Sequence, residues 1–282
     1  MSAVPQFSMA ARASIVSLLL FVAFLAIWQL ATSRDVQVQE ELDEYALLMG
    51  KGAQKTDGLP TPAALGKVIW KHLSDPFYDA GANDKGIGIQ LGYSLGRVAL
   101  GFVLAAIVAI PLGFLIGMSP LMQLALNPYI QILKPISPLA WMPLALYTIK
   151  NSTTSSIFVI FICALWPMLI NTAHGVASVK RDWVNVARTL EVRRLRTAFR
   201  VVLPAAAPTI LTGMRISMGI AWLVIVAAEM LVGGTGIGYF VWNEWNNLSL
   251  ENVIFAILVI GVVGMILDYM FARAQRAVTY VE

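Results

Sequence analysis

The chain has 282 residues, of which 58% are hydrophobic and only 13% charged. Soluble domains average roughly 45–50% apolar and 25% charged residues, so this composition excludes an ordinary soluble protein and indicates an all-α integral membrane protein. The net charge of +4 does not indicate nucleic-acid binding, because the basic excess lies at 180–200, between two apolar runs, where the positive-inside rule explains it. Cys163 is the single cysteine, so no internal disulfide can form.

Six apolar runs approach or exceed the ~20 residues that cross a bilayer. We expect spans at 14–31, 91–117, 121–147, 155–177, 209–232 and 252–271. The first run follows Arg12, and we interpret it as an uncleaved span because it is long for a signal peptide and no clear cleavage site follows.

The charge of the connecting segments predicts the topology. Segment 32–90 carries nine acidic and six basic side chains, whereas loop 178–208 carries seven basic and two acidic ones. We therefore expect 32–90 on the outer face, and the loop, both termini and the tail 273–282 in the cytoplasm. The chain then divides into an N-terminal span with its outer segment (1–90) and a transmembrane domain (91–272).

Residues 59–78 predict a short helix on the outer face. Pro62 suits a first helical position, and Asp75-Pro76 ends the pattern. Its apolar stripe consists of Leu65, Val68, Ile69 and Leu73. Since Lys67 and Lys71 lie beside this stripe, we expect the helix to lie flat on the membrane.

Glycine and proline mark the second and third spans. The pairs Gly92/Gly96 and Gly113/Gly117 predict close approach between helices. The third span contains Pro128, Pro135, Pro138 and Pro143. Each proline removes a backbone donor, so this span either lines a water-filled cavity or is simply a kinked, packed helix.

Charged residues inside spans are costly and suggest function. Lys134 directly precedes the Pro135–Pro138 break and could be a waypoint for a small anion, or could extend toward the headgroups. Arg215 could face the exit of a pathway or reach the headgroups, and we expect Glu229 to pair with a neighbouring span rather than touch substrate. The candidate pathway residues are Lys134, Ser137, Trp141, Arg215, Trp222 and Glu229.

Two further charges, Arg97 and Asp268, lie nearer the ends of their spans, where we expect them to act as anchors. For Trp222, near the middle of its span, packing in the core competes with a position along the pathway.

Sequence signals of catalysis are weak. The GK pairs at 50–51 and 66–67 lack the spacing of a Walker A motif, and 233–238 follows an apolar span rather than a strand, so we interpret it as a flexible turn at the outer mouth. His72 and His174 have no partners at metal-ligand spacing. We expect no enzymatic activity, no metal and no cofactor bound by this chain.

Loop 178–208 is the strongest functional signal. Five arginines lie between Arg188 and Arg200, and Trp183, Ala187 and Leu190 fall on one helical face. A basic, folded and amphipathic loop of this kind indicates a docking surface for another protein.

The same loop resembles the EAA motif of ABC-importer permeases, EAA-x3-G-x9-I-x-LP. The residues at the named positions of the motif are, in order, Asn185, Val186, Ala187, Glu191, Val201, Leu203 and Pro204. The resemblance extends from about 92 to 272 and is closest to the nitrate/sulfonate/bicarbonate group, in particular to permeases of nitrate importers. Asn185 replaces the glutamate of the motif and Glu191 its glycine, so we expect a different backbone angle at that turn.

This resemblance implies a type I (MetI-like) permease fold of six transmembrane helices in a bacterial inner membrane. The implied partners are a second permease copy (a homodimer is favoured), two ABC ATPase subunits, identical or different, and a periplasmic or lipid-anchored solute-binding protein. ATP and Mg²⁺ belong to the ATPases. The coupling residues are Asp182, Trp183, Asn185, Val186, Ala187, Arg188, Leu190 and Glu191.

The resemblance also implies a docking geometry. A helix at 182–190 sits in a groove of the ATPase, with Trp183, Ala187 and Leu190 as apolar anchors. Asp182 at the helix start is favoured by the macrodipole, and Arg188 reaches acidic groups of the partner.

The expected function is ATP-driven uptake of nitrate, and also nitrite, by alternating access. The same machine could instead import taurine or other alkanesulfonates, or bicarbonate, because all are anions. An ion-driven secondary transporter is a distant alternative; it predicts inverted internal repeats, and no fixed-period repeat is evident.

Overall fold

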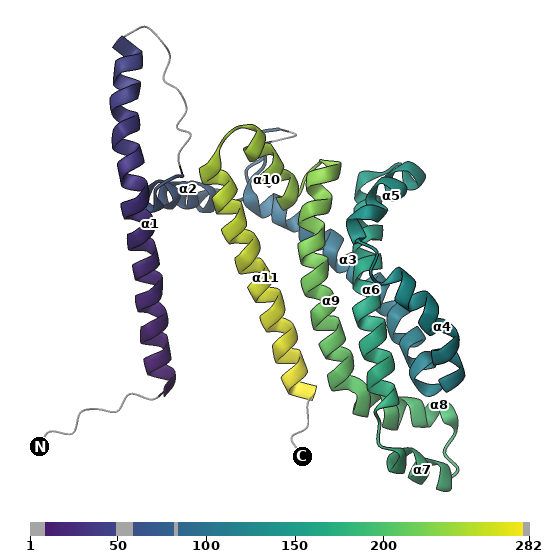
Figure 1. Ribbon diagram of the computed structural model, residues 1–282. Coiled ribbons are helices and arrows are strands. Elements are labelled where there is room, and N and C mark those ends of the chain that lie inside the picture. Colours follow the sequence, from purple (N-terminus) through teal and green to yellow (C-terminus); the bar gives the residue numbers. More distant parts are fainter. Residues whose placement is uncertain (1–8, 49–58, 82–83, 279–282) are drawn as a thin grey trace, which may run out of the picture.

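The computed structural model describes residues 9–48, 59–81 and 84–278. Its helices are α1 (Met9–Leu48), α2 (Pro62–Ser74), α3 (Ile87–Met118), α4 (Pro120–Leu133), α5 (Met142–Ile149), α6 (Ser152–Ala177), α7 (Arg181–Thr189), α8 (Arg194–Thr197), α9 (Leu203–Val232), α10 (Ile237–Asn246) and α11 (Leu250–Val278), with a 3₁₀ turn η1 (Pro138–Trp141) and a π-helical turn η2 (Ala198–Val202) (Figure 1). The Gly50-Lys51 pair, parts of the predicted outer segment and the last four residues of the tail lie outside these ranges.

Within the described residues, five helices are long and apolar enough to cross a membrane, and a bent pair makes a sixth when it is counted as one span. This agrees with the six predicted runs. The third run is not continuous, because α4 and the segment Pro138–Ile149 meet at an angle of 83°. Pro135 and Pro138 lie at this break, where they remove backbone donors and prevent one helix from continuing.

The centre of the bundle is formed by α3, α6 and α9. Glycines let α3 and α6 approach closely: a Cβ at Gly113 would lie 2.7 Å from Thr172 Cβ, and one at Gly117 2.7 Å from Val176 Cβ. The predicted close approach is therefore confirmed for this pair. At Gly92 and Gly96 no such approach occurs among the described residues, since an added Cβ there would meet nothing within 4 Å.

The two ends of the bundle differ (Figure 1). One end, here called the α7 end, carries α7 and α8 together with the first turns of α1 and the last turns of α11. The opposite end, here called the α10 end, carries α2 and α10. Helix α1 stands apart from the core, and only 6% of its most apolar segment is buried in the chain.

Helix α2 begins and ends where the sequence predicts. Thr61 Oγ1 accepts a hydrogen bond from Ala64 N at 3.2 Å, Pro62 is the first helical residue, and Asp75 follows the last. Most of the predicted apolar stripe does not face outward, however. Leu65 is buried, and Val68 and Ile69 pack against the core, so most of the stripe faces protein.

A short turn connects α2 to α3. Lys85 Nζ lies 2.9 Å from Asp79 Oδ2, and this hydrogen bond lowers the pKa of Asp79. Tyr78 donates a hydrogen bond to Asp84 Oδ1 at 2.9 Å. Burial, followed by this bond to a carboxylate, raises the pKa of Tyr78 to about 12, so the phenol stays neutral at physiological pH.

Candidate functional site

Helix α7 forms the amphipathic part of the basic loop and lies within one residue of the predicted helix at each end. Trp183, Val186 and Leu190 are exposed, with fractional exposures of 44%, 60% and 70%. Ala187 is only 5% exposed and packs inside the loop, which corrects its expected role as an outward anchor. The exposed apolar face is therefore formed by Trp183, Val186 and Leu190, and Val186 takes the place assigned to Ala187.

Polar groups surround this face. Asp182 lies in the first turn of α7 and Arg188 in the last, the two positions that the helix dipole favours for these charges. Lys180 Nζ lies 5.4 Å from the centre of the Trp183 ring. Asn185 is exposed, and its carbonyl accepts a hydrogen bond from the Thr189 hydroxyl at 3.1 Å.

The turn after α7 uses the left-handed conformation. Glu191 has φ 52°, and Val192 N donates to Ala187 O at 3.0 Å. The expectation of a different backbone angle at Glu191 is thus wrong: the residue adopts the angle that glycine usually supplies at a helix C-terminus. The hydrogen bonds that close this turn offset the steric cost of placing a side chain there.

Lys134 ends α4 and lines a cavity of about 420 Å³ at the break in the third span. The other walls come from the break after α4, from η1, α6 and α9: Ile136, Pro138, Ile162, Cys163, Trp166, Pro167, Ile170, Asn171 and Ile220. Of the two interpretations of the proline-rich span, the structure supports a cavity. One cationic group in a mostly apolar hollow can attract a small anion.

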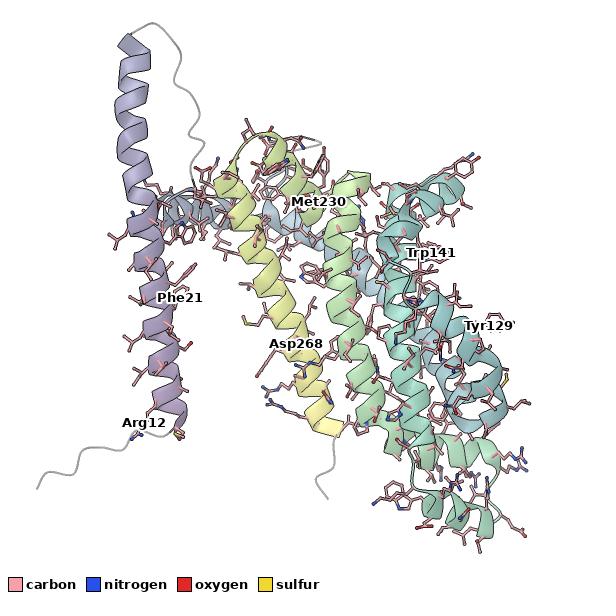
Figure 2. The ribbon with its side chains drawn as sticks, in the orientation of Figure 1. Arg12, Phe21, Tyr129, Trp141, Met230 and Asp268 are labelled. Atoms are coloured by element: carbon pink, nitrogen blue, oxygen red, sulfur yellow. The ribbon has the colours of Figure 1, made fainter. Side chains whose placement is uncertain are left out.

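Ser137 and Trp141 lie in the same break. Ser137 is exposed and precedes η1, and its carbonyl accepts from Ala140 N at 3.0 Å. Trp141 lies where η1 meets α5, beside the upper part of α6 (Figure 2). Its buried indole nitrogen has no hydrogen-bond partner among the described residues. Neither side chain contributes to the walls of the Lys134 cavity.

At the α10 end, a buried ion pair joins α3 to α9. Arg97 Nη1 lies 2.7 Å from Glu229 Oε1, and the side chains of Arg97 and Glu229 are 9% and 1% exposed. Arg97 was expected to anchor a span end in the headgroups; it points into the protein instead, because its counter-ion lies there. Glu229 pairs with a neighbouring span, as predicted, and its burial removes it from the candidate pathway.

This ion pair also organises the glycine-rich turn before α10. Glu229 Oε2 accepts from Gly238 N at 3.0 Å, and Arg97 Nη1 donates to Thr235 O at 2.8 Å. Two side chains of α3 complete the set: Gln90 Oε1 accepts from Gly236 N, and Ser94 Oγ accepts from Ile237 N. We call these groups the Arg97–Glu229 clasp. The turn that was predicted to be flexible is instead held by hydrogen bonds between its backbone and side chains of α3 and α9.

Glycine is required at two positions of this turn. A Cβ at Gly236 would overlap the Glu229 carboxylate, and one at Gly238 would overlap the carbonyl oxygen of Val226. The glycines therefore allow the backbone to approach the buried Glu229 carboxylate closely. Backbone N–H groups bind anions in a similar way in phosphate-binding loops, but here the anion is a side chain of the same protein.

A second ion pair joins α9 to α11. Arg215 binds Asp268 through two hydrogen bonds of 2.6 Å, and Asp268 lies in the lower half of α11 (Figure 2). Arg215 is therefore held by a carboxylate, and Asp268 is its partner rather than an anchor in the headgroups. Both line a groove of about 560 Å³ that reaches Ile220, which also borders the Lys134 cavity.

Trp222 belongs to the packed core. It is 5% exposed, and its indole nitrogen donates to Ile260 O at 3.0 Å. A buried, hydrogen-bonded indole stabilises the contact between α9 and α11, so Trp222 is not free to face a pathway.

Residues 109–280 match a family described as the binding-protein-dependent transport system inner membrane component. The chain belongs to this family. It is therefore a membrane component of a transport system, not an enzyme.

Curated relatives cover most of the permease. A nitrate import permease protein (NrtB) of Synechocystis sp. is 44% identical over 84% of this chain and 84% of its own length. The NrtB protein of Leptolyngbya laminosa is 42% identical over 91% of this chain and 85% of its own length. A bicarbonate transport system permease protein (CmpB) of Synechocystis sp. is 44% identical over 73% of this chain and 74% of its own length.

Solved structures confirm the fold. An inward-facing structure of the MetNI methionine ABC transporter matches 67% of this chain and 94% of its own chain, with a TM-score of 0.60 and 13% identity. The predicted MetI-like helical fold is confirmed.

Several residues of the permease's site carried no recognisable signal in the sequence. Gln90 and Ser94 look like ordinary polar residues near the start of a span, and only the fold brings them to the turn before α10. Trp166 and Asn171 line the Lys134 cavity from α6. They are five residues apart, which is not a same-face spacing in an α-helix, so helical periodicity does not group them.

The clasp yields a stability prediction. Glu229→Gln removes the counter-ion of a buried guanidinium, and breaking a buried pair in this way costs about 3–5 kcal/mol. We expect a clear fall in the melting temperature of the detergent-solubilised permease, measured by tryptophan fluorescence. The double variant Arg97→Gln/Glu229→Gln leaves no unpaired charge and should recover much of the loss. Additive losses in the double variant would contradict the pairing.

Proposed function

We propose that this permease is the membrane-spanning subunit of an ATP-driven importer that moves nitrate, and also nitrite, across a bacterial inner membrane. The observation that carries the proposal is identity of 42–44% with two nitrate import permeases over 84–91% of the chain. The Lys134 cavity supports it physically, because a cationic group beside a broken span suits a small monovalent anion.

In this proposal two copies of the permease form the pathway, and two ABC ATPase subunits bind at the α7 end. ATP and Mg²⁺ are held by those ATPases, and a solute-binding protein delivers the anion at the α10 end. The positive charge of the basic loop supports a cytoplasmic α7 end, and with it cytoplasmic termini. The charged pair Arg215–Asp268 is partly exposed within the spans, which favours a face covered by protein or water rather than lipid.

The coupling step follows from the shape of the loop. The face of Trp183, Val186 and Leu190 fits the helix-in-groove mode of recognition. Closure of the ATPases around ATP would move the two α7 helices together and bias the spans toward the outward-open state. The permease then supplies the two-state pathway, and nucleotide and anion shift its populations.

Bicarbonate is the second candidate substrate, because a bicarbonate permease shows the same 44% identity over a somewhat shorter match. Reconstitution of the permease in proteoliposomes, with ATPase subunits and binding protein from the same organism, distinguishes the two. We expect nitrate to stimulate ATP hydrolysis and to accumulate inside the vesicles, whereas bicarbonate does neither. Stimulation by bicarbonate alone would replace the nitrate assignment.

A charge introduced on the exposed face of α7 tests coupling more directly than one at Ala187. A charge at that buried position would also disrupt the loop itself. Val186→Asp places a carboxylate in the apolar contact with the ATPase. We expect a loss of docking free energy of about 2 kcal/mol or more, roughly a 30-fold weaker association. Co-purification of the ATPases and substrate-stimulated hydrolysis measure this loss. Val186→Ala is the matched control and should be mild; normal coupling in Val186→Asp would exclude this face.

The pathway predicts a role for the charge of Lys134. Lys134→Ala should lower anion uptake by about tenfold, since a focused positive field raises local anion concentration by that order or more. Basal ATP hydrolysis should be unchanged, because the ATPases are remote from the cavity. Lys134→Arg keeps the charge and should retain most uptake. Unchanged uptake kinetics in the alanine variant would remove Lys134 from the pathway.

A further inference from the structure

Helix α2 is fixed to the bundle along one side. His72 Nε2 lies 3.0 Å from Asn252 Oδ1 of α11, and the imidazole stacks on Phe255 with ring centres 4.8 Å apart. Asn252 Nδ2 donates in turn to Glu244 of α10 at 2.6 Å. This chain of contacts ties the position of α2 to the first turns of α11 and to α10.

The other side of α2 is uncovered and strongly apolar. Trp70 and Leu73 are 76% and 59% exposed, and Phe77 just beyond the helix is 70% exposed. Trp70 and Leu73 are three residues apart and share one flank, whereas Lys67 and Lys71 are four apart and share another. Of these residues, only Leu73 belongs to the stripe predicted from the sequence, whose other members pack against protein.

The orientation of α2 identifies what covers this flank. Helices α1 and α11 run along the bundle, whereas α2 runs across it at the α10 end, between these two helices (Figure 1). The membrane span of α1 is almost wholly exposed, with side chains such as Phe21 projecting from it (Figure 2). The apolar flank of α2 therefore continues a surface that already faces lipid, at the level where α11 begins.

We propose that α2 is a membrane-surface helix. Trp70, Leu73 and Phe77 enter the interfacial layer of the bilayer, and Lys67 and Lys71 bind the phosphates of anionic lipid headgroups. Tryptophan prefers this layer, and lysine beside an apolar flank is typical of helices that lie in the membrane plane. Through His72 and Asn252, the headgroup layer then sets the position of the outer end of α11. This inference does not depend on which anion is transported.

Spin labelling of the full chain in lipid nanodiscs tests the apolar contact. Nitroxides are attached to cysteines in Trp70→Cys and Leu73→Cys, with Phe21→Cys as the lipid-facing control and Ala80→Cys as the control in the exposed turn. Cys163 is buried, and labelling of the unaltered chain measures its background. We expect labels at 70 and 73 to collide more with oxygen than with a water-soluble nickel chelate, as at 21. Behaviour like that at 80, or shielding from both reagents by a protein partner, would overturn the proposal.

Lipid composition tests the lysines. In nanodiscs that contain phosphatidylglycerol, the label at 70 should lie deeper than in discs of phosphatidylcholine alone, because anionic headgroups attract Lys67 and Lys71. The double variant Lys67→Gln/Lys71→Gln should lose this difference, while the label at 21 should show none in either background. A label at 70 that ignores phosphatidylglycerol, or a difference that persists in the double variant, would exclude headgroup binding by the lysines.

Discussion

Two opposite charges buried at the α10 end hold α3, α9 and α10 in one arrangement. A buried carboxylate is tolerated when its charge is paired and its oxygens accept hydrogen bonds. Glu229 meets this condition with Arg97, Ser94 and the amide of Gly238. The glycine-rich turn has to approach the carboxylate closely, which explains why a Cβ fits at neither Gly236 nor Gly238.

The α7 end of the bundle is built differently from the α10 end. Helix α7 exposes apolar side chains and lies among arginines, with few contacts to the rest of the chain. Helix α9 connects the two ends (Figure 1). It begins in the last part of the basic loop and carries Glu229 in its last turn. A displacement of the loop would therefore be carried along one continuous helix, past the Lys134 cavity, to a clasp that resists deformation. This arrangement suits a protein that a partner drives from one side.

Sequence reasoning about individual side chains succeeded where spacing decided the outcome. The bounds of α2 followed from proline and aspartate, and those of α7 from the resemblance to the EAA motif. The cluster of prolines in one span allowed either a cavity or a kinked, packed helix, and the structure has a cavity at Lys134. It failed where the partner came from a distant segment. Arg97 and Asp268 resembled anchors because they lie toward span ends, yet each binds an opposite charge on α9. Ala187 was expected to face outward because its spacing from Trp183 places both residues on one side of the helix. Helical periodicity does not say which part of that side the loop buries, and Ala187 is buried.

By itself, the sequence determined that the chain crosses a membrane as a set of helices and carries a basic docking loop, because hydropathy, charge and motif spacing are local properties. Only the tertiary structure decided which charges neutralise each other, which flank of α2 stays exposed and which apolar side chains of α7 face outward. These properties depend on how helices far apart in sequence pack together. Burial and pairing are set by such contacts, so they become visible only when the helices are assembled.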